Sequence, residues 1–554
     1  MSDIAALVSD HLDIWAAATV RKSGAGRGGG KRVSFYGIER LRALILDLAL
    51  CGRLVPQIAS DEPASDLMKR VGQERAALGP KVSKAEAVAP PPDLPAGWVA
   101  VRLADVANPQ AGFAFKSVGF NELGVGLPLI RIRDVGQPFT GTFYSGDYRD
   151  EFVVQEGDYL ISMDGEFRVA TWIGPDALLN QRVSRLQFYG DEVVRPFVAM
   201  ALQAELTKLQ GIKAYTTVDH LSGKQIAGSL ILFPPLAEQQ RIVAKVDELM
   251  ALCDALEGES AAALAAHQTL VETLFATLVN SADPADLAAN WSRLEANFDT
   301  LFTTEASVDT LKQTVLELAV RGRLTRPEHE DGQVDQILAA IAEHRKVKAK
   351  QGRRRMPDVP ARAVDGAEIP FVIPEHWQFA RFQDVLINRD AERIPVSSEE
   401  RVGRKGEYDY YGASGVIDKI DGFLFEEPLL LIGEDGANLI NRSTPIAFVA
   451  RGKYWVNNHA HVLEAFSETL LRYMEIFINA IDLKPYVTGT AQPKMNQAKM
   501  NSIIVALPPA DEMKRVIAKV DALMVLCDDL KARITKAGQI QMRLADTIVE
   551  RATA

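Results

Sequence analysis

Apolar residues recur at intervals of three and four along three segments of the chain, the spacing that places them on one face of an α-helix. Two of these segments, 234–256 and 508–530, begin with paired prolines and carry Glu238 or Glu512 in the first turn, as helix starts do. Their apolar positions are Val243, Val246, Met250, Cys253 and Leu256, and Ile517, Val520, Met524, Cys527 and Leu530. The third stripe is Leu41, Leu44, Leu48 and Cys51, and it ends at Gly52, a residue suited to a helix C-terminus. We predict antiparallel helix pairs packed as a coiled coil, with Cys253 and Cys527 in the core.

The pattern is duplicated along the chain. PPLAEQQRIVAKVDELMALCDAL at 234–256 returns as PPADEMKRVIAKVDALMVLCDDL at 508–530, an offset of 274 residues without a gap. LRALILDLALCGRL at 41–54 returns as LKQTVLELAVRGRL at 311–324, an offset of 270. LPAGWVAVRLADV at 94–106 returns as IPEHWQFARFQDV at 373–385, an offset of 279. Matches in one order at nearly constant spacing indicate a tandem duplication.

The repeat is also cyclically offset. The second copy stops soon after its long helix, and the partner helix that it lacks matches the beginning of the chain, from Tyr36 to Cys51. We therefore expect the first and last helices to pack together, which would bring the termini near each other and give the molecule a pseudo-two-fold axis.

Two globular blocks, 93–233 and 371–507, combine short β-rich runs with Gly, Asn and Asp turns and one helix each, 195–210 and 468–481. The runs include PLIRIRDV at 128–135, DYLISMDG at 158–165, LLLIGEDG at 429–436 and PIAFVARG at 445–452. The predicted fold class is α+β, with two blocks that alternate with long-helix regions. The predicted boundaries are 1–92 (helix and linker), 93–235 (first block), 236–345 (central helices), 346–371 (basic, Pro-containing linker), 372–509 (second block) and 510–554 (C-terminal helix).

Composition and charge limit the classes of protein to which the chain can belong. The 554 residues are 47% hydrophobic and 24% charged, as in ordinary globular proteins of several domains. No run approaches eighteen consecutive apolar residues and the N-terminus lacks a secretory signal, so we expect no membrane span and a cytoplasmic location. The three cysteines stand singly, without disulfide or metal-ligand spacing. The net charge of the whole chain, −11, argues against nucleic-acid binding. DNA affinity, however, depends on locally placed Lys and Arg.

A search for catalytic motifs is negative. No methyltransferase tetrapeptide, glycine-rich S-adenosylmethionine loop or convincing nuclease pattern is present. The segment RKSGAGRGGGKR at 21–32, predicted to be a flexible basic loop, lacks the glycine spacing and the Ser or Thr of a phosphate-binding loop, so we reject a nucleotide site. His459 and His461 would share a strand face and could bind a metal, but a third ligand is not evident, and a structural or DNA-contacting role is favoured. We predict no metal site.

Polar clusters in the blocks favour DNA contact. Arg131 and Arg133 alternate on one predicted strand face, and Arg168 follows the Asp164-Gly165 turn, which recurs at Asp435-Gly436. Asn and Gln pair with adenine and Arg with guanine, as Asn180, Gln181 and Arg182 would. The remaining candidates in the first block are Lys116, Lys213, Tyr215, Thr216 and His220. Those in the second block are Tyr410, Tyr411, Asn441, Arg442, Asn458, His459 and Lys494, the last within the loop 488–496.

With these features the chain resembles the specificity subunit of type I restriction-modification systems along nearly its whole length. The resemblance is carried by the (L/I)P-x-x-W openings at 94–98 and 373–377, by MDGEFR at 163–168 and by LNQR at 179–182. YYGASG at 410–415, NNHAHVL at 457–463 and the two PP-x-x-E helices complete it. The chain differs from many relatives in starting with a partner helix and linker, 1–92.

The resemblance implies a subunit without catalysis of its own. Two target-recognition domains would each bind one half of a bipartite, asymmetric double-stranded DNA site, and the helices would form the spacer between them. Two modification subunits, which methylate adenine at N6, would dock on the helices, at Glu238, Arg241, Glu512 and Arg515, and a restriction and translocase subunit would join. S-adenosylmethionine, ATP and Mg²⁺ would be held by these partners and no cofactor by this chain. The alternatives are a coiled-coil scaffold that binds proteins and a stand-alone modification enzyme.

Overall fold

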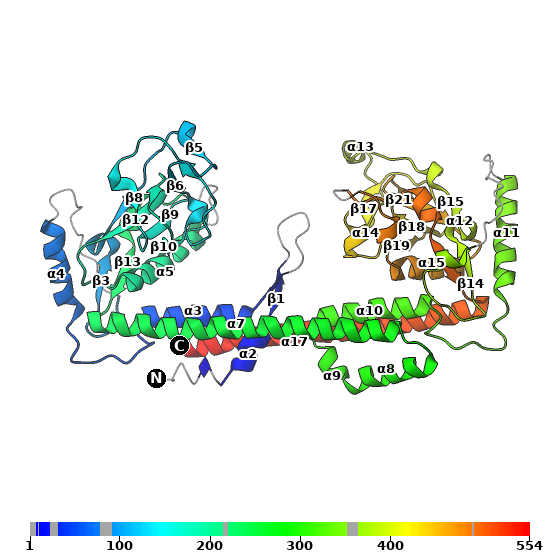
Figure 1. The fold of residues 1–554 in the computed structure, drawn as a ribbon, viewed down its shortest axis with the longest axis horizontal. Coiled ribbons are helices and arrows are strands. Elements are labelled where there is room, and N and C mark those ends of the chain that lie inside the picture. The colour runs from blue at the N-terminus through cyan, green and yellow to red at the C-terminus, as the bar shows by residue number, and fades with distance from the viewer. Residues whose placement is uncertain are drawn as a thin grey trace. The chain divides into compact units, whose positions relative to one another are not determined.

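The computed structural model describes residues 7–8, 10–22, 32–77, 91–213, 220–351, 364–489 and 492–553. The chain divides into two compact units. Unit 1 comprises 1–22, 32–261 and 539–554, and unit 2 comprises 23–31 and 262–538. Each unit holds one β-rich block and one helical layer (Figure 1).

The block of unit 1 is built on two sheets and a short ladder. The sheets have the strand orders β10-β9-β12-β4 and β5-β7-β6-β11-β8, and β3 pairs with β13. The bounds of the first sheet and the ladder are β3 (Val99–Arg102), β4 (Ala107–Ala111), β9 (Tyr159–Ser162), β10 (Val169–Thr171), β12 (Val183–Phe188) and β13 (Leu230–Phe233). Those of the second sheet are β5 (Phe120–Asn121), β6 (Leu127–Ile130), β7 (Phe143–Tyr144), β8 (Val153–Val154) and β11 (Ala177–Leu179). Helices α5 (Arg195–Lys213) and α6 (Gly223–Gly228) complete the block.

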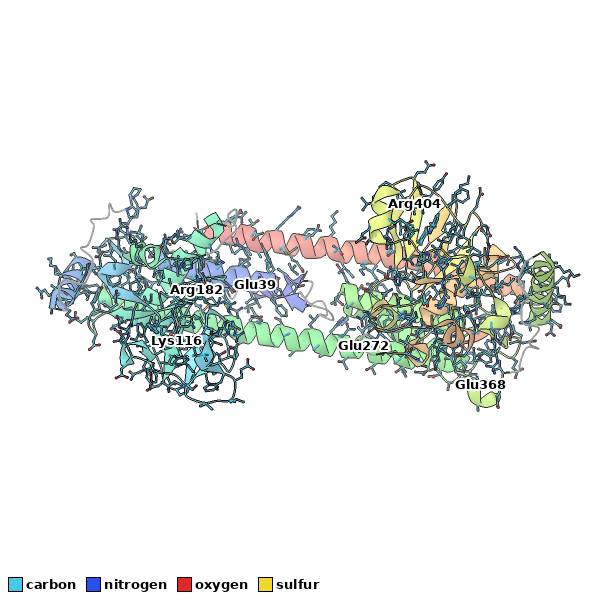
Figure 2. All side chains as sticks on the ribbon, turned by 90° about the horizontal axis from the view of Figure 1, so that it is seen from above. Glu39, Lys116, Arg182, Glu272, Glu368 and Arg404 are labelled. Atoms are coloured by element: carbon cyan, nitrogen blue, oxygen red, sulfur yellow. The ribbon has the colours of Figure 1, made fainter. Side chains whose placement is uncertain are left out.

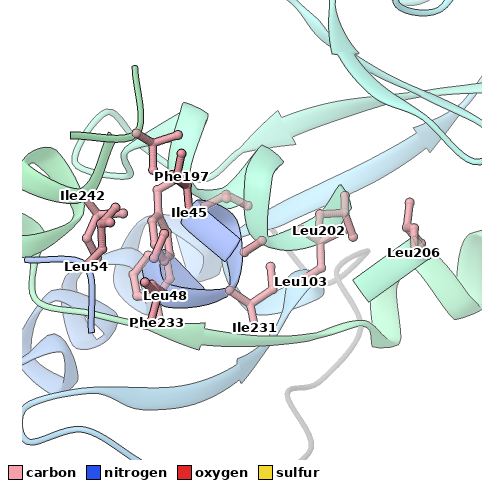
Figure 3. Packing of buried hydrophobic residues seen from close by; sticks show 14 of the residues in the cluster. Ile45, Leu48, Leu54, Leu103, Phe197, Leu202, Leu206, Ile231, Phe233 and Ile242 are labelled. Atoms are coloured by element: carbon pink, nitrogen blue, oxygen red, sulfur yellow. The ribbon is translucent and has the colours of Figure 1, made fainter. Parts of the chain in front are cut away.

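The helical layer of unit 1 contains α2 (Leu12–Ala17), α3 (Tyr36–Leu50) and α4 (Ala64–Ala77). It also contains the first part of α7 (Leu236–Val279) and the last part of α17 (Ala510–Thr553). Figure 3 shows how buried side chains of α3, α5, β13 and α7 meet in one core, among them Leu48, Phe197, Phe233 and Ile242. The block is therefore fixed to the helices of its own unit by a shared hydrophobic core.

The first and last helices of the chain pack together in unit 1. The hydroxyl of Tyr36 donates to Asp546 (2.8 Å), and Arg40 forms an ion pair with the same carboxylate. On its other side α3 binds α7, where Arg42 pairs with Glu257 (2.6 Å). Because Ala545 and Val549 of α17 enter the core of this unit, the expected packing of the first helix against the last one is present.

The block of unit 2 repeats the arrangement. Its sheets have the strand orders β15-β21-β18-β19 and β17-β16-β20, and β14 pairs with β22. The strands are β14 (Gln378–Arg381), β15 (Ile387–Asn388), β16 (Tyr408–Gly412), β17 (Gly415–Ile420), β18 (Leu429–Gly433), β19 (Ala447–Ala450), β20 (Tyr454–Val456), β21 (Ala460–Glu464) and β22 (Ile504–Leu507). The helices are α12 (Phe382–Val385), α13 (Ser398–Gly403), α14 (Asn438–Asn441), α15 (Glu468–Ala480) and α16 (Gln497–Asn501). The α+β class and the alternation of blocks with long helices are confirmed.

In the helical layer of unit 2, α10 (Glu305–Val320) runs antiparallel to α17. Glu305 bonds to Thr535, Asp309 to Lys531 and Lys312 to Asp528, so the numbers rise on one helix as they fall on the other. The remaining helices are α8 (Pro284–Ala296), α9 (Phe298–Leu301) and α11 (Val334–Gln351). Helix α11 contains residues 346–351, which the sequence pattern places in a linker.

Helix α7 is, within the described ranges, the one helix that is long and apolar enough to cross a membrane by length and composition. A single helix of this kind is weak evidence of insertion. In unit 2 its side chains Val271, Phe275 and Leu278 instead pack with Cys527 of α17.

The structure agrees with the sequence prediction for two of the three cysteines and differs from it for Cys51 and for part of the basic segment 21–32. Cys253 and Cys527 are buried, as predicted, whereas Cys51 follows the end of α3 and is exposed, because the helix stops before the stripe is complete. Gly52 adopts φ 73°, the left-handed conformation expected after a helix. Part of the predicted flexible basic loop is a hairpin, formed by β1 (Val20–Lys22) and β2 (Arg32–Ser34); residues 23–31 lie outside the described ones.

Two of the repeated motifs, the P-x-x-W opening and the PP-x-x-E helix, contact each other in both units. The indole N–H of Trp98 donates to Glu238 Oε2 (3.1 Å), and that of Trp377 donates to Glu512 Oε2 (2.9 Å). Both carboxylates are buried, so the prediction that they dock partner subunits is wrong. Their role is to join the P-x-x-W opening of each block to the start of its long helix.

The neighbouring arginines belong to the same junctions. Arg241 pairs with Asp61 (2.6 Å) and Arg515 pairs with Asp331, which is 4% exposed. These intramolecular ion pairs hold the loop after α3 or α10 against the long helix. Both guanidinium groups are still partly exposed, so the docking role of Arg241 and Arg515 stays a prediction beside this structural one.

We expect Glu238→Gln to be more stable than the wild type at pH 7. Burial raises the pKa of Glu238 above its usual 4.5. The carboxyl group therefore stabilises the fold when protonated, below its unfolded pKa, and this contribution is lost as the pH rises through the folded pKa. The gain in the free energy of unfolding should be about 1.4 kcal/mol per unit of pKa shift. The amide of the variant can still accept the hydrogen bond from the Trp98 N–H, so that contact should not be lost. The gain should vanish near pH 4, where the wild-type carboxyl group is protonated. Urea unfolding between pH 4 and 8 measures it; Glu248→Gln, at an exposed position of the same helix, should show no such gain.

Candidate nucleic-acid interface

A tight turn after strand β9 brings charged side chains together in the first block. Gly165 follows Asp164 at φ 68°, a conformation that glycine adopts without strain. Asp164 lies opposite His220 in an isolated β-bridge. Beside this bridge, the N–H of Met163 donates to the carbonyl of Arg182, and the N–H of Leu221 donates to the carbonyl of Met163. The turn is thus held by the residue before β12 and by the segment after α5.

Asp164 binds two basic side chains. Its carboxylate lies 3.0 Å from Nη1 of Arg182 and 2.6 Å from Nδ1 of His220, and Arg182 Nη1 is 3.2 Å from the same imidazole nitrogen. Arg182 lies among the side chains of the first block (Figure 2) and is 51% exposed. Its Nη2 and Nε donors bond to no described residue, so they can bind a ligand from solvent.

The second block contains a matching arrangement around Asp435. His459 Nδ1 lies 2.7 Å from Asp435 Oδ2, and Lys494 Nζ lies 3.2 Å from Glu434 Oε1. Lys494 is 53% exposed and His459 51% exposed, whereas Glu434 is nearly buried. Gly436, at φ 104°, closes the turn as Gly165 does in the first block.

Backbone register establishes which residues correspond. Val183 pairs with Ser162 in unit 1, as Ala460 pairs with Gly433 in unit 2, so the preceding residues Arg182 and His459 are equivalent. The bridge between Asp164 and His220 corresponds to the one between Asp435 and Lys494. The two blocks therefore present the same frame with different basic groups: Arg and His in one, His and Lys in the other.

The acidic members of these sites were not predicted as site residues. The sequence showed the repeated Asp-Gly turn, but nothing in it paired Asp164 with Arg182 or Glu434 with Lys494. The usable signal was the offset of 271 residues between the turns, close to the 274 that separates His220 from Lys494.

Other candidates of the first block lie elsewhere. Strand β6 ends at Ile130, so Arg131 and Arg133 do not alternate on a strand; a 3-10 turn follows because Asp134 accepts the N–H of Arg131. Arg133 bonds to Thr140 and Thr142, and Arg168 pairs with Glu166. Lys116 and Gln181 are exposed. Lys213 ends α5, with its side chain outside the described ones, and Tyr215 and Thr216 also lie outside the described residues.

In the second block two predicted contacts belong to the core. Tyr410 is fully buried, and its hydroxyl donates to the carbonyl of Val396, so the prediction that it contacts DNA is wrong. Tyr411 is partly buried between Phe448 and Tyr454. Burial also raises the pKa of Tyr411. Asn441 and Asn458 are exposed.

Arg442 caps a helix. Its guanidinium donates to the carbonyls of Ile478 (3.3 Å) and Ile481 (2.7 Å), at the end of α15, and burial lowers its pKa. The backbone of Arg442 is left-handed, at φ 50°. Since its donors are used inside the block, the prediction that Arg442 contacts DNA is wrong.

We expect Arg442→Ala to destabilise unit 2 by about 1–2 kcal/mol and to leave base preference unchanged, because it removes hydrogen bonds to otherwise uncapped carbonyls. Hydrogen exchange of α15 measures the loss, and selection from random duplexes measures the preference. Arg442→Lys, which keeps the charge, should recover part of the protection. A changed base preference in a variant with normal exchange would contradict the structural role.

The histidine pair does not form a metal site. His459 precedes β21 and binds Asp435, whereas His461 is buried within the strand, with Nδ1 2.6 Å from Asp390 and Nε2 2.9 Å from the carbonyl of Met495. The two side chains thus have different partners, contrary to the shared face predicted. No group of three or more His, Cys, Asp or Glu that could hold a metal occurs in the part of the chain that the structure describes.

Comparison with known proteins gives matches over both blocks. The family model for the type I restriction modification DNA specificity domain matches residues 95–266 and 374–537. The type I restriction enzyme EcoEI specificity subunit of Escherichia coli is 32% identical, over 99% of this chain and 99% of its own. The EcoAI specificity subunit of Escherichia coli is 30% identical, again over 99% of each. A solved chain from the type I R-M system, 15% identical, covers 84% of this chain and 99% of its own at a TM-score of 0.44.

Proposed function

This chain belongs to the type I restriction-modification DNA specificity family, and we propose that each of its blocks binds one half of a bipartite, asymmetric DNA site through its Asp-Gly turn. One observation carries this proposal. The two turns have the same backbone frame, but Arg182 and His220 in the first correspond to His459 and Lys494 in the second. Equal frames with unequal donors would give two different half-sites.

The side chains suit contacts in the major groove. The free edge of Arg182 can donate to both O6 and N7 of guanine, the commonest specific protein–DNA contact. Asp164 would fix the direction of that edge before DNA binds, so less side-chain entropy is lost on binding. In the second block, Lys494 would bind guanine or phosphate, and His459 would act as the oriented group. Gln181, exposed beside Arg182, would pair with adenine.

Catalysis would be supplied by other subunits. The family resemblance implies two modification subunits that methylate adenine at N6 and a restriction and translocase subunit, with S-adenosylmethionine, ATP and Mg²⁺ bound by those partners. The long helices α7 and α17 would provide their docking surface, in the cytoplasm. The role of this chain is then to place the methyl-transfer site on one sequence.

Competition binding tests the proposal. The assembled complex should bind one bipartite duplex at least about a thousandfold more tightly than an unrelated duplex, with log affinity falling steeply against log salt. Exchanging the bases of one half-site, whichever half is changed, should abolish the preference for the bipartite duplex over the unrelated one. Salt-independent binding without sequence preference would favour a protein-binding scaffold instead, and methyl transfer by the purified chain alone would show that it is an enzyme.

A further inference from the structure

His461 is a buried histidine of the second block that lies beneath the turn of Asp435 and is not part of it. Only 1% of its surface is exposed. Its Nδ1 is 2.6 Å from Oδ2 of Asp390, and its Nε2 is 2.9 Å from the carbonyl oxygen of Met495. A carbonyl oxygen and an ionised carboxylate only accept hydrogen bonds, so both ring nitrogens must donate. The geometry therefore requires a doubly protonated, positively charged imidazole.

Asp390 is the counter-charge of this imidazolium. Its carboxylate also accepts hydrogen bonds from Asn388 Nδ2 (2.9 Å) and from the N–H of Val462 (2.8 Å), as an ionised group does. Burial alone would lower the pKa of His461, but the hydrogen bond to Asp390 and its charge outweigh burial and raise this pKa above its usual 6.5. The fold thus stabilises the charged form.

Glu434 connects the imidazolium to the recognition turn. Its Oε2 lies 3.9 Å from His461 Nδ1 and 2.9 Å from Arg393 Nη1. Its Oε1 lies 3.2 Å from Lys494 Nζ, and Arg393 Nη2 lies 3.6 Å from Asp390. These four groups come from the turn after β15, from the end of β18 and from the segment before α16. The charge of His461 therefore acts on the same carboxylate that holds Lys494.

The backbone beside Lys494 is attached to the same group. The carbonyl of Met495 accepts from His461, and the N–H of Met495 donates to the carbonyl of Glu434 (2.8 Å). Lys494 lies opposite Asp435 in the bridge that closes the turn. If Nε2 lost its proton, its lone pair would face the Met495 carbonyl, and the two acceptors would repel each other. The imidazolium thus fixes the backbone from which Lys494 extends.

The first block has neutral residues at the equivalent positions. By the backbone register described above, Ser184 corresponds to His461. Met163 likewise corresponds to Glu434, and the buried Ser184 hydroxyl donates to its sulfur (3.2 Å). Ala111 pairs with Ser184 on the neighbouring strand, on the side from which an aspartate approaches His461. The two frames therefore differ in a buried charge.

We propose that the His461 imidazolium is a positioning group for Lys494, so that DNA recognition by the second block requires a proton that the first block does not need. This inference rests on the proposed function, in which Lys494 binds DNA. Because the folded-state pKa of His461 is raised, its contribution is complete below the unfolded value of about 6.5 and is lost as the pH rises through the folded value.

The test is His461→Gln in the full-length chain, assembled with its partner subunits, with DNA selection between about pH 6 and about pH 9. In the wild type, preference for the second half-site should fall by up to about tenfold for each pH unit above the folded pKa, as the competent fraction falls. The variant cannot carry the charge, so its preference should be weak already at low pH. The ratio of wild-type to variant preference should therefore approach one at alkaline pH.

The pH profile separates positioning from packing. A packing defect in His461→Gln would give the same ratio at every pH, and that result would overturn the proposal. So would a wild-type preference for the second half-site that does not change with pH. Both proteins keep the exposed His220 and His459, so the titration of these two groups cancels in the ratio.

Two further variants complete the test. Asp390→Asn keeps the histidine but removes its counter-charge, so the loss of second-half preference should move to lower pH even if His461→Gln fails to assemble. Ser184→Ala, at the equivalent position of the first block, is the matched control and should leave both pH profiles unchanged. If the wild-type complex shows no preference in either half at any pH, the proposed function fails instead.

Discussion

Replacing Arg182 by alanine is expected to relax the requirement for one base pair in one half of the target, and to leave the other half unchanged. A bidentate arginine–guanine contact contributes about 1–3 kcal/mol of discrimination, so preference at that position should fall by roughly five- to 150-fold. Selection from duplexes randomised in both halves measures the effect. Arg195→Ala removes an arginine of similar exposure that also pairs with one aspartate, and it should leave both halves unchanged.

Asp164→Asn separates contact from orientation. The amide keeps the volume but loses the charge that holds Arg182 and His220, so the same position should relax by a smaller factor. Full specificity in both Arg182→Ala and Asp164→Asn would remove this turn from base recognition. The corresponding change in the second block, Asp435→Asn, should affect the other half-site only.

Glu512→Ala is expected to destabilise unit 2 by about 3 kcal/mol. The carboxylate is fully buried and accepts hydrogen bonds from Thr325, His376 and Trp377, so its removal leaves buried donors without a partner. Native-state hydrogen exchange of the β14-β22 ladder, next to Trp377, measures the loss.

Two controls bracket this result. Asp511→Ala changes the adjacent residue, which is 56% exposed, and should cost less than about 0.5 kcal/mol. Glu512→Gln keeps an acceptor for Trp377 and should cost less than the alanine. If Glu512→Ala unfolded no more readily than Asp511→Ala, the junction would have no structural role.

The repeat and the helices could be predicted from the sequence because their signals are local. The stripe through Val246 and Met250 and its copy through Val520 and Met524 each require only helical periodicity. The full length of α7 and α17 could not be predicted from the sequence. Beyond residues 256 and 530 the stability of these helices depends on partners from distant segments, as when α10 packs against α17.

The fate of polar and aromatic residues was less predictable, because it depends on contacts between residues far apart in sequence. Tyr410 and Tyr411 are adjacent and chemically identical, yet Tyr410 is fully buried and Tyr411, which packs against a different core cluster, is only partly buried. Arg442 and Arg182 both lie near turns. The guanidinium of Arg442 binds carbonyls at the end of α15, whereas that of Arg182 pairs with Asp164. The sequence predicts accessible carboxylates for Glu238 and Glu512 in a first helical turn, but both are buried and accept hydrogen bonds from the distant indoles of Trp98 and Trp377.

We propose that this chain alone selects the DNA sequence that its partners modify. The most direct test is a genome-wide map of N6-methyladenine in the source organism, with the chain present, deleted, or replaced by Arg182→Ala. We predict methylation of one bipartite motif, its loss on deletion, and a relaxed base in one half in the variant. Methylation that is unchanged by deletion of the chain would contradict the account.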